Sequence, residues 1–117
     1  MFLQISKPSM PVKISTIGSE HSMDVAYALA HRYPPENPSQ DVTASHMEIV
    51  GSLLYASFWA DGLRVFDISQ PAAPREIGAW RGEGTDPSDA PLLAWQVIQH
   101  HSLVLLNSLN HGTYILR

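Results

Sequence analysis

Cysteine is absent from the 117-residue sequence, which excludes disulfide bonds, thiolate metal sites and cysteine nucleophiles. Charged residues are scarce, at 15 %, and the net charge is −4, so no basic surface of the kind that binds nucleic acid is expected. No apolar run approaches the ~20 residues of a membrane-spanning helix. The opening MFLQISKPSMP also lacks the basic start and apolar core of a signal peptide.

Signature motifs of catalysis are missing as well. The sequence has no glycine-rich phosphate loop, no His-Glu-x-x-His zinc motif and no Gly-x-Ser-x-Gly nucleophile elbow. With 44 % hydrophobic residues, the composition is that of one modest globular domain. These features favour a non-enzymatic protein, although they leave the question of enzyme activity open.

What the sequence does contain is an internal repeat. The segments LQISKPSMPVKI (3–14) and FDISQPAAPREI (66–77) share the pattern Ile-Ser-x-Pro-x-x-Pro-x-x-Ile at a spacing of 63 residues. A second echo, at a spacing of 50, places SLLYASFWADGLRVFD (52–67) over SLVLLNSLNHGTYILR (102–117). Self-similarity of this kind indicates a repeat architecture built from one supersecondary unit.

The repeated segments have the features of short antiparallel strands. Their apolar stretches are rich in β-branched and aromatic residues, and they flank the turns at Asp61-Gly62 and His111-Gly112. The prolines after each Ile-Ser end a strand because proline lacks a backbone donor. We therefore predict strands at Phe2–Ser6, Val12–Ile17, His46–Val50, Leu53–Trp59, Leu63–Ser69, Arg75–Trp80, Ala94–Gln99, Ser102–Leu109 and Thr113–Leu116.

Two stretches interrupt this rhythm. Residues 18–45 contain a proline-rich loop, HRYPPENPSQD, preceded by MDVAYAL, which fits either an inner strand or a short helix; we favour the strand. Residues 81–93 form a linker rich in Gly, Pro and Asp. The chain thus divides into the end of a preceding unit (1–17), the insertion, a complete four-stranded unit (46–80), the linker and an incomplete last unit (94–117).

The stretch LYASFWADGLRVFDISQPAAPREIGAW resembles the LVIVD-repeat family of β-propeller proteins. The segment 2–17 is similar to the end of another blade, with Gln4 where the family has Asp. The tail resembles a degenerate last blade, with Thr113 and Tyr114 in place of Leu and Arg. The positions that match the family's blade pattern are Tyr55, Gly62, Leu63, Val65, Asp67, Ile68, Ser69, Pro71 and Pro74.

This resemblance implies an all-β fold, a partial β-propeller of antiparallel four-stranded blades around a channel. At ~40–45 residues per blade, the chain supplies fewer than three blades, whereas a propeller has about four or more. We therefore expect part of a longer LVIVD-repeat protein, with assembly of copies into a ring as the alternative. The implied partners are the remaining blades or other copies, and an unknown protein or small-molecule ligand. Resembling proteins are often exported or at the cell surface, and the compartment of this chain is left open.

Histidines and tryptophans are the candidates for a binding site. His46 opens the innermost strand of the complete unit and His21 begins the insertion, so both are placed near the implied channel, where imidazoles can bind a metal ion. Trp59 and Trp95 are candidates for ligand binding, although large aromatic side chains more often pack between adjacent blades. No catalytic residue is assigned, and a metal ion at His21 and His46 is the one cofactor left open.

The expected function is that of a non-enzymatic scaffold for protein or ligand binding. The alternative is a histidine-lined propeller that binds a metal or acts as an oxidoreductase. Asp67 is expected to accept hydrogen bonds from backbone donors near the end of its strand. Asp61 is expected mainly to favour the turn in which it lies.

Overall fold

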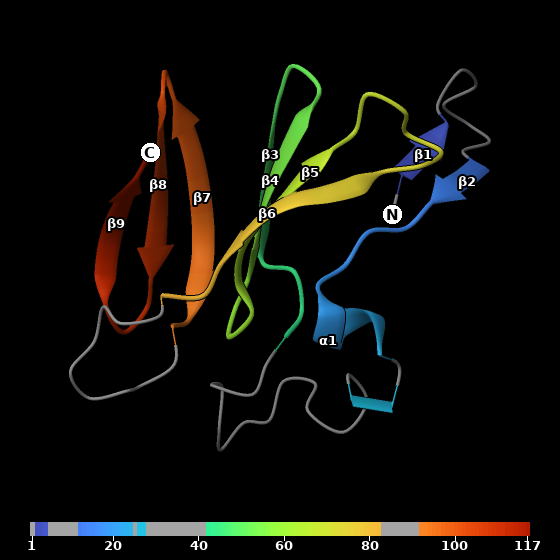
Figure 1. Cartoon of the computed structure of the whole chain (residues 1–117). Coiled ribbons are helices and arrows are strands. Elements are labelled where there is room, and N and C mark those ends of the chain that lie inside the picture. Colours follow the sequence, from blue (N-terminus) through green and yellow to red (C-terminus); the bar gives the residue numbers. More distant parts are fainter. Residues whose placement is uncertain (1, 5–11, 25, 28–41, 83–91) are drawn as a thin grey trace.

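A computed structural model describes residues 2–4, 12–24, 26–27, 42–82 and 92–117 of the chain. Its described part is mostly β, with antiparallel strands in three sheets and a helical turn (Figure 1). The predicted proline-rich loop, His31 within it, and most of the predicted linker lie outside the described residues.

Strands that are neighbours in the sequence are also neighbours in each sheet. The four-stranded sheet has the order β3-β4-β5-β6, the three-stranded sheet β7-β8-β9, and the two-stranded sheet pairs β1 with β2. The nine strands predicted from Phe2–Ser6 to Thr113–Leu116 are all present among the described residues, with differences at some ends, whereas the strand favoured in MDVAYAL is not among them. The bounds are β1 Phe2–Gln4, β2 Val12–Ser15, β3 His46–Val50, β4 Leu53–Phe58, β5 Gly62–Asp67, β6 Arg75–Trp80, β7 Ala94–His100, β8 Leu103–Ser108 and β9 Gly112–Leu116.

The two repeated glycines lie in hairpins, as predicted. Phe58 of β4 pairs with Gly62 of β5, and Ser108 of β8 pairs with Gly112 of β9. The φ angles of Gly62 and Gly112 are 71° and 84°, in the left-handed region that glycine adopts without a steric cost. The 50-residue repeat in the sequence is therefore also a repeat in backbone conformation.

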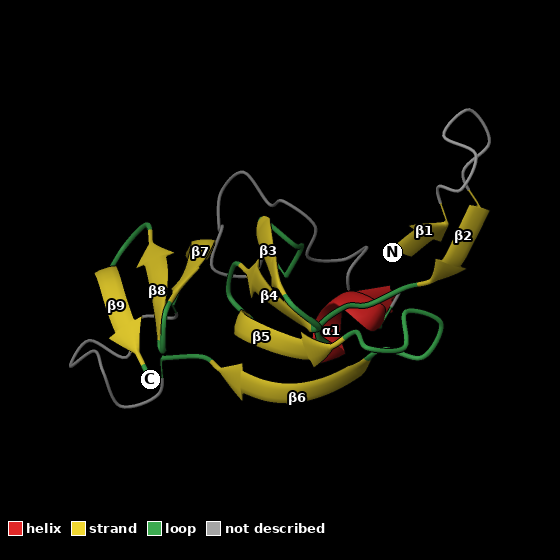
Figure 2. Ribbon diagram, turned by 90° about the horizontal axis from the view of Figure 1, so that it is seen from above, coloured by secondary structure: helices red, strands yellow, loops and turns green. Residues whose placement is uncertain are grey.

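The four-stranded sheet has other layers packed on both of its faces (Figure 2). On the side of the three-stranded sheet, buried Leu63 packs against Val97 and Leu106. On the opposite side, Ile17 packs against a buried cluster of Leu54, Ala56, Phe58 and Phe66. Because burial of each large apolar side chain contributes roughly 1.5–3 kcal/mol, these two clusters hold the layers together.

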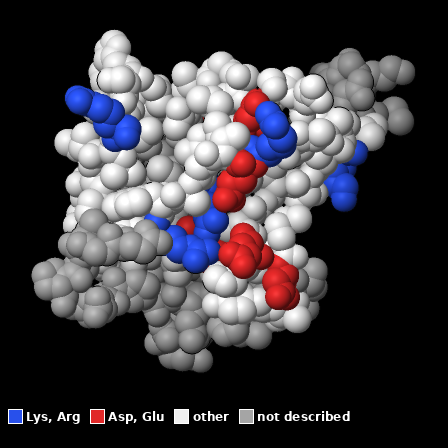
Figure 3. Space-filling view, viewed as in Figure 1, with Lys and Arg blue, Asp and Glu red and all other residues white. Residues whose placement is uncertain are grey.

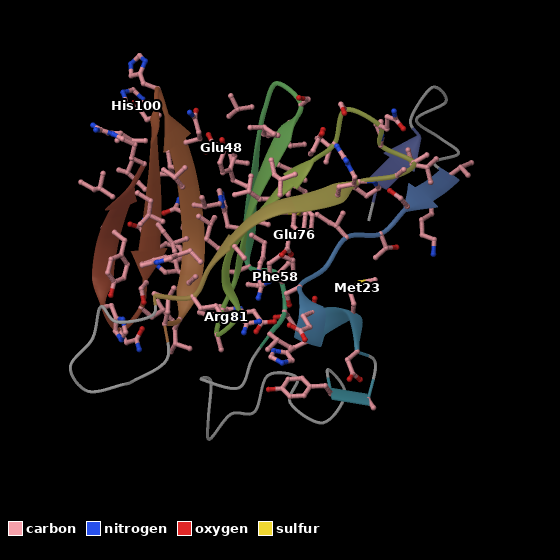
Figure 4. The ribbon with its side chains drawn as sticks, in the orientation of Figure 1. Met23, Glu48, Phe58, Glu76, Arg81 and His100 are labelled. Carbon is pink, nitrogen blue, oxygen red and sulfur yellow. The ribbon has the colours of Figure 1, made fainter. Side chains whose placement is uncertain are left out.

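Polar contacts reinforce the packing of the two larger sheets. The hydroxyl of Ser45 donates to the Trp95 carbonyl at 2.8 Å, and the carboxylate of Glu48 accepts from the backbone N–H of Gln99. Figure 4 shows Glu48 between β3 and β7. Hydrogen bonds thus link β3, and the residue just before it, directly to β7.

In the described residues of MDVAYAL, the favoured strand is not formed. The helical turn α1 covers Glu20–Met23, and Ala26 and Tyr27 are also helical. The Ser19 hydroxyl accepts from the backbone N–H of Ser22 at 3.2 Å, and the Asp24 carboxylate accepts from that of Tyr27 at 3.0 Å. These two caps satisfy backbone donors at helical starts, so the described part of the segment adopts the short-helix alternative.

A closed propeller is not part of what the structure describes. Within residues 42–82 and 92–117, neither of the two larger sheets closes on itself. The fold is accordingly a mostly β fold with antiparallel sheets of four and three strands packed face to face.

Candidate functional site

A buried carboxylate, Asp61, lies in the turn between β4 and β5 and is 3 % exposed. The hydroxyl of Ser19 donates to its Oδ2, and Nδ1 of His21 lies 2.8 Å from its Oδ1. Nη2 of Arg81 is 3.7 Å from the same Oδ1, and Nε of Arg64 donates to the Asp61 carbonyl at 3.1 Å. Figure 4 shows Arg81 at the end of the four-stranded sheet that holds this turn.

The Asp61 carboxylate is stabilised in its ionised form. Burial acts to raise the pKa of Asp61, but hydrogen bonds from Ser19 and His21 and the positive charges of His21 and Arg81 outweigh it. The pKa of Asp61 is therefore lowered from 3.8. The charged carboxylate fastens the segment around α1 to the four-stranded sheet.

Ser19, His21 and Asp61 contain the residue types of a catalytic triad but not its geometry. In a triad the histidine accepts the proton of the serine and the carboxylate orients the histidine. Here the serine hydroxyl donates to the carboxylate, and Ser19 is fully buried, at 0 % exposure. The cluster is therefore a structural tether of the chain.

His21 and His46, the predicted metal pair, have different surroundings. His21 contacts Asp61, and its ring stacks on Tyr27 with centroids 4.5 Å apart. His46 is half-buried, and its Nδ1 is buried with no hydrogen-bond partner. Among the described residues, no three His, Cys, Asp or Glu side chains gather as metal ligands. The metal site at His21 and His46 stays a prediction.

Of the three tryptophans, Trp80 packs against a core cluster, whereas Trp59 and Trp95 do not. Trp80 meets Tyr114 edge-on, with centroids 4.9 Å apart, between the two larger sheets. Trp59 is half-buried and forms a backbone bridge with Ala94. Trp95 is 41 % exposed, so it is the more accessible of the two predicted binding residues.

Asp67 has the role that the sequence predicted. Its Oδ1 accepts from the backbone N–H of Ser69 at 2.9 Å, and its Oδ2 lies 3.4 Å from Nη2 of Arg75. The backbone hydrogen bond from Ser69 is the main reason why the pKa of Asp67 is lowered from 3.8. Asp67 thus stabilises the loop that follows β5.

Sequence reasoning missed a cleft of about 630 Å³ between the two larger sheets. Val65, Gly78 and Trp80 line it from the four-stranded sheet, and Leu116 and Arg117 line it from the other. The cleft depends on how far the two sheets separate beyond β4 and β7, and no motif encodes that separation. Gly78, which leaves space between the sheets, was the one local signal.

Charged side chains form mixed pairs rather than a patch of one sign. On the face shown in Figure 3, acidic and basic groups alternate in a band over β6 and α1. Arg64 pairs with Glu76 at 3.4 Å, and Arg81 lies 3.7 Å from Glu20. The band therefore stabilises neighbouring elements of the chain itself.

Comparisons with protein-family models, with curated proteins and with solved structures found no match for this chain. Within the described residues, no helix has the length and apolar character required to cross a membrane. The class defined by the fold is a mostly β protein with stacked antiparallel sheets.

Proposed function

We propose that the chain is a non-enzymatic segment of a β-propeller of the LVIVD type, a scaffold whose sheets bind further sheets of the same repeat and present loops to ligands. The observation that carries the proposal is that equivalent positions have equivalent orientations. In the four-stranded sheet, Tyr55, Leu63 and Val65 face the three-stranded sheet. The 50-residue spacing places Leu105, Thr113 and Ile115 at the same positions in the three-stranded sheet.

These equivalent positions lie on the side of the three-stranded sheet that faces away from the core. Leu105 pairs with Ile98 and Ile115, and the alternation with buried Leu106 turns all three outward. Ile98 is 39 % exposed and Ile115 is 68 % exposed. We call Ile98, Leu105 and Ile115 the tail face.

A second exposed apolar face lies on the far side of the four-stranded sheet, next to the cluster that Ile17 covers. Met47 and Ile49 of β3 are 54 % and 58 % exposed, on the side of the four-stranded sheet that holds the Leu54 cluster. We call Met47 and Ile49 the head face. Each sheet of the repeat thus has one side for the preceding layer and another for the following layer.

Two different apolar faces, on opposite sides of the two stacked sheets, favour head-to-tail association. Repeat units that contact only their neighbours leave unsatisfied faces at the ends of an array, and exposed apolar patches mark interaction sites. The occupant that matches the tail face is therefore a sheet presenting a head face, either from the same longer protein or from a second copy. Such heterologous contacts generate rings or open arrays.

Sedimentation of the purified chain tests this proposal. We expect reversible, concentration-dependent oligomers, because burial of the tail face in a partner is favourable. Ile115→Asp should produce a monomer, since it places a charge within the contact. The matched control is Leu109→Asp, which alters a turn residue that is 61 % exposed and lies outside both faces. Association that survives Ile115→Asp, or that is lost equally in both variants, would contradict the proposal.

A further inference from the structure

The cleft between the two larger sheets has the size and lining of a small-molecule site. Its volume of about 630 Å³ lies within the range of roughly 300–1,000 Å³ that is typical of ligand pockets. Its walls are mainly apolar, with Trp80 and Val65 on one side and Leu116 on the other. These side chains are part of the partly buried layer around the core, so the walls are fixed by packing.

The polar groups of the cleft favour a negatively charged ligand group. Among the described residues that line it, the titratable side chains are those of Tyr55, His101 and Arg117, and none is acidic. On the face shown in Figure 3, the basic atoms over the end of the three-stranded sheet stand apart from the acidic ones. This charge distribution complements an anion, because Arg117 supplies positive charge and both Arg117 and the His101 ring can donate hydrogen bonds.

The backbone of His101 gives a second, independent indication. Its φ of 54° lies in the left-handed region, which is unfavourable for a residue with a Cβ. The equivalent turn of the four-stranded sheet has Gly51 there, with φ 60°. The sequence thus has a strained histidine where the repeat offers an unstrained glycine, and the strained residue lines the cleft. Retained strain of this kind is found at ligand sites.

We infer that the cleft binds a small ligand with a flat apolar body and one anionic group, such as an aromatic carboxylate or sulfonate. The apolar body packs between Trp80 and Leu116, and the anionic group lies at His101 and Arg117. This site is separate from the tail face and from the Asp61 tether. Its existence does not depend on the proposed association of sheets.

The test uses two dyes that differ in charge: 8-anilinonaphthalene-1-sulfonate and the uncharged N-phenyl-1-naphthylamine. Fluorescence titrations are carried out in the Ile115→Asp background, so that dye at the tail face does not contribute. We expect Arg117→Gln and His101→Gly each to weaken binding of the sulfonate up to roughly fivefold, as for loss of one solvent-exposed contact to a charged group. Both variants should leave the affinity for the uncharged dye unchanged.

Gly78→Val tests the location of the site. A Cβ at Gly78 would lie 3.8 Å from Cβ of Val65, an ordinary contact, so the strand accepts a side chain that occupies the cleft. We expect this variant to weaken both dyes about tenfold or more, with an unchanged circular dichroism spectrum. Dye binding that is unaffected by Gly78→Val, or equal for the two dyes in every variant, would overturn the inference. Neither result would alter the sedimentation of the parent chain, so the proposed function is tested separately.

Discussion

At the residue scale, Asp61 shows how one side chain joins distant parts of the chain. The sequence predicted a turn residue, and Asp61 does lie in the β4–β5 turn. Its carboxylate also holds Ser19, His21 and Arg81, contacts that no local pattern could reveal because they come from segments far apart in the sequence. A buried acid in a hairpin turn therefore has a tertiary role beyond its local one.

Replacing Asp61 by Asn should destabilise the chain by about 1–3 kcal/mol at neutral pH, because the carboxylate's hydrogen bond with His21 is weakened and its charge contact with Arg81 is lost. The folded-state pKa of Asp61 is lowered from 3.8, so its contribution is fully present above that value and is lost as the pH falls through the folded-state pKa. The difference in unfolding free energy between parent and variant should therefore shrink as the pH falls from about 5 to about 2. Urea unfolding at several pH values measures this difference in unfolding free energy. A difference that does not change with pH would contradict the stabilising role assigned to the ionised Asp61 carboxylate.

At the element scale, the strands were predictable because their signals are local. Alternation of apolar residues, the Gly62 and Gly112 turns and the prolines after each Ile-Ser placed every strand that the structure describes. The strand favoured around Tyr27 was wrong. The apolar pattern there fits both the helical and the strand period, and the helical conformation follows from the caps at Ser19 and Asp24. Capping depends on a single polar side chain, and the periodicity of apolar residues carries no information about it.

The two repeated glycines should respond differently to the same substitution. A Cβ at Gly62 would collide with the Trp80 carbonyl and lie 2.9 Å from Cα of Arg81, whereas a Cβ at Gly112 has nothing within 4 Å. Gly112→Ala should cost only the left-handed backbone term, about 1–2 kcal/mol. Gly62→Ala should cost more than about 3 kcal/mol, since a clash is added. Thermal unfolding compares them, and equal losses would show that the β5–β6 contact is not tight.

At the scale of the whole molecule, the sequence indicated stacked repeat units but not how their faces are filled. The 50-residue spacing was visible, and with the strands it predicted equivalent sheets. The cleft could not be predicted, because it depends on the separation of two sheets rather than on any residue pattern. The head face depends on tertiary packing in the same way. Ile17 covers Phe66 and its neighbours, whereas the apolar side chains of β3 on the same side remain exposed.

The most direct test of the head-to-tail arrangement mixes two variants that are each blocked at one face. Met47→Asp blocks the head face and Ile115→Asp blocks the tail face, so each variant alone should sediment as a monomer. An equimolar mixture should form a 1:1 dimer that grows no further, because only one intact head and one intact tail remain to pair. A mixture that stays monomeric, or either variant forming dimers by itself, would contradict the account.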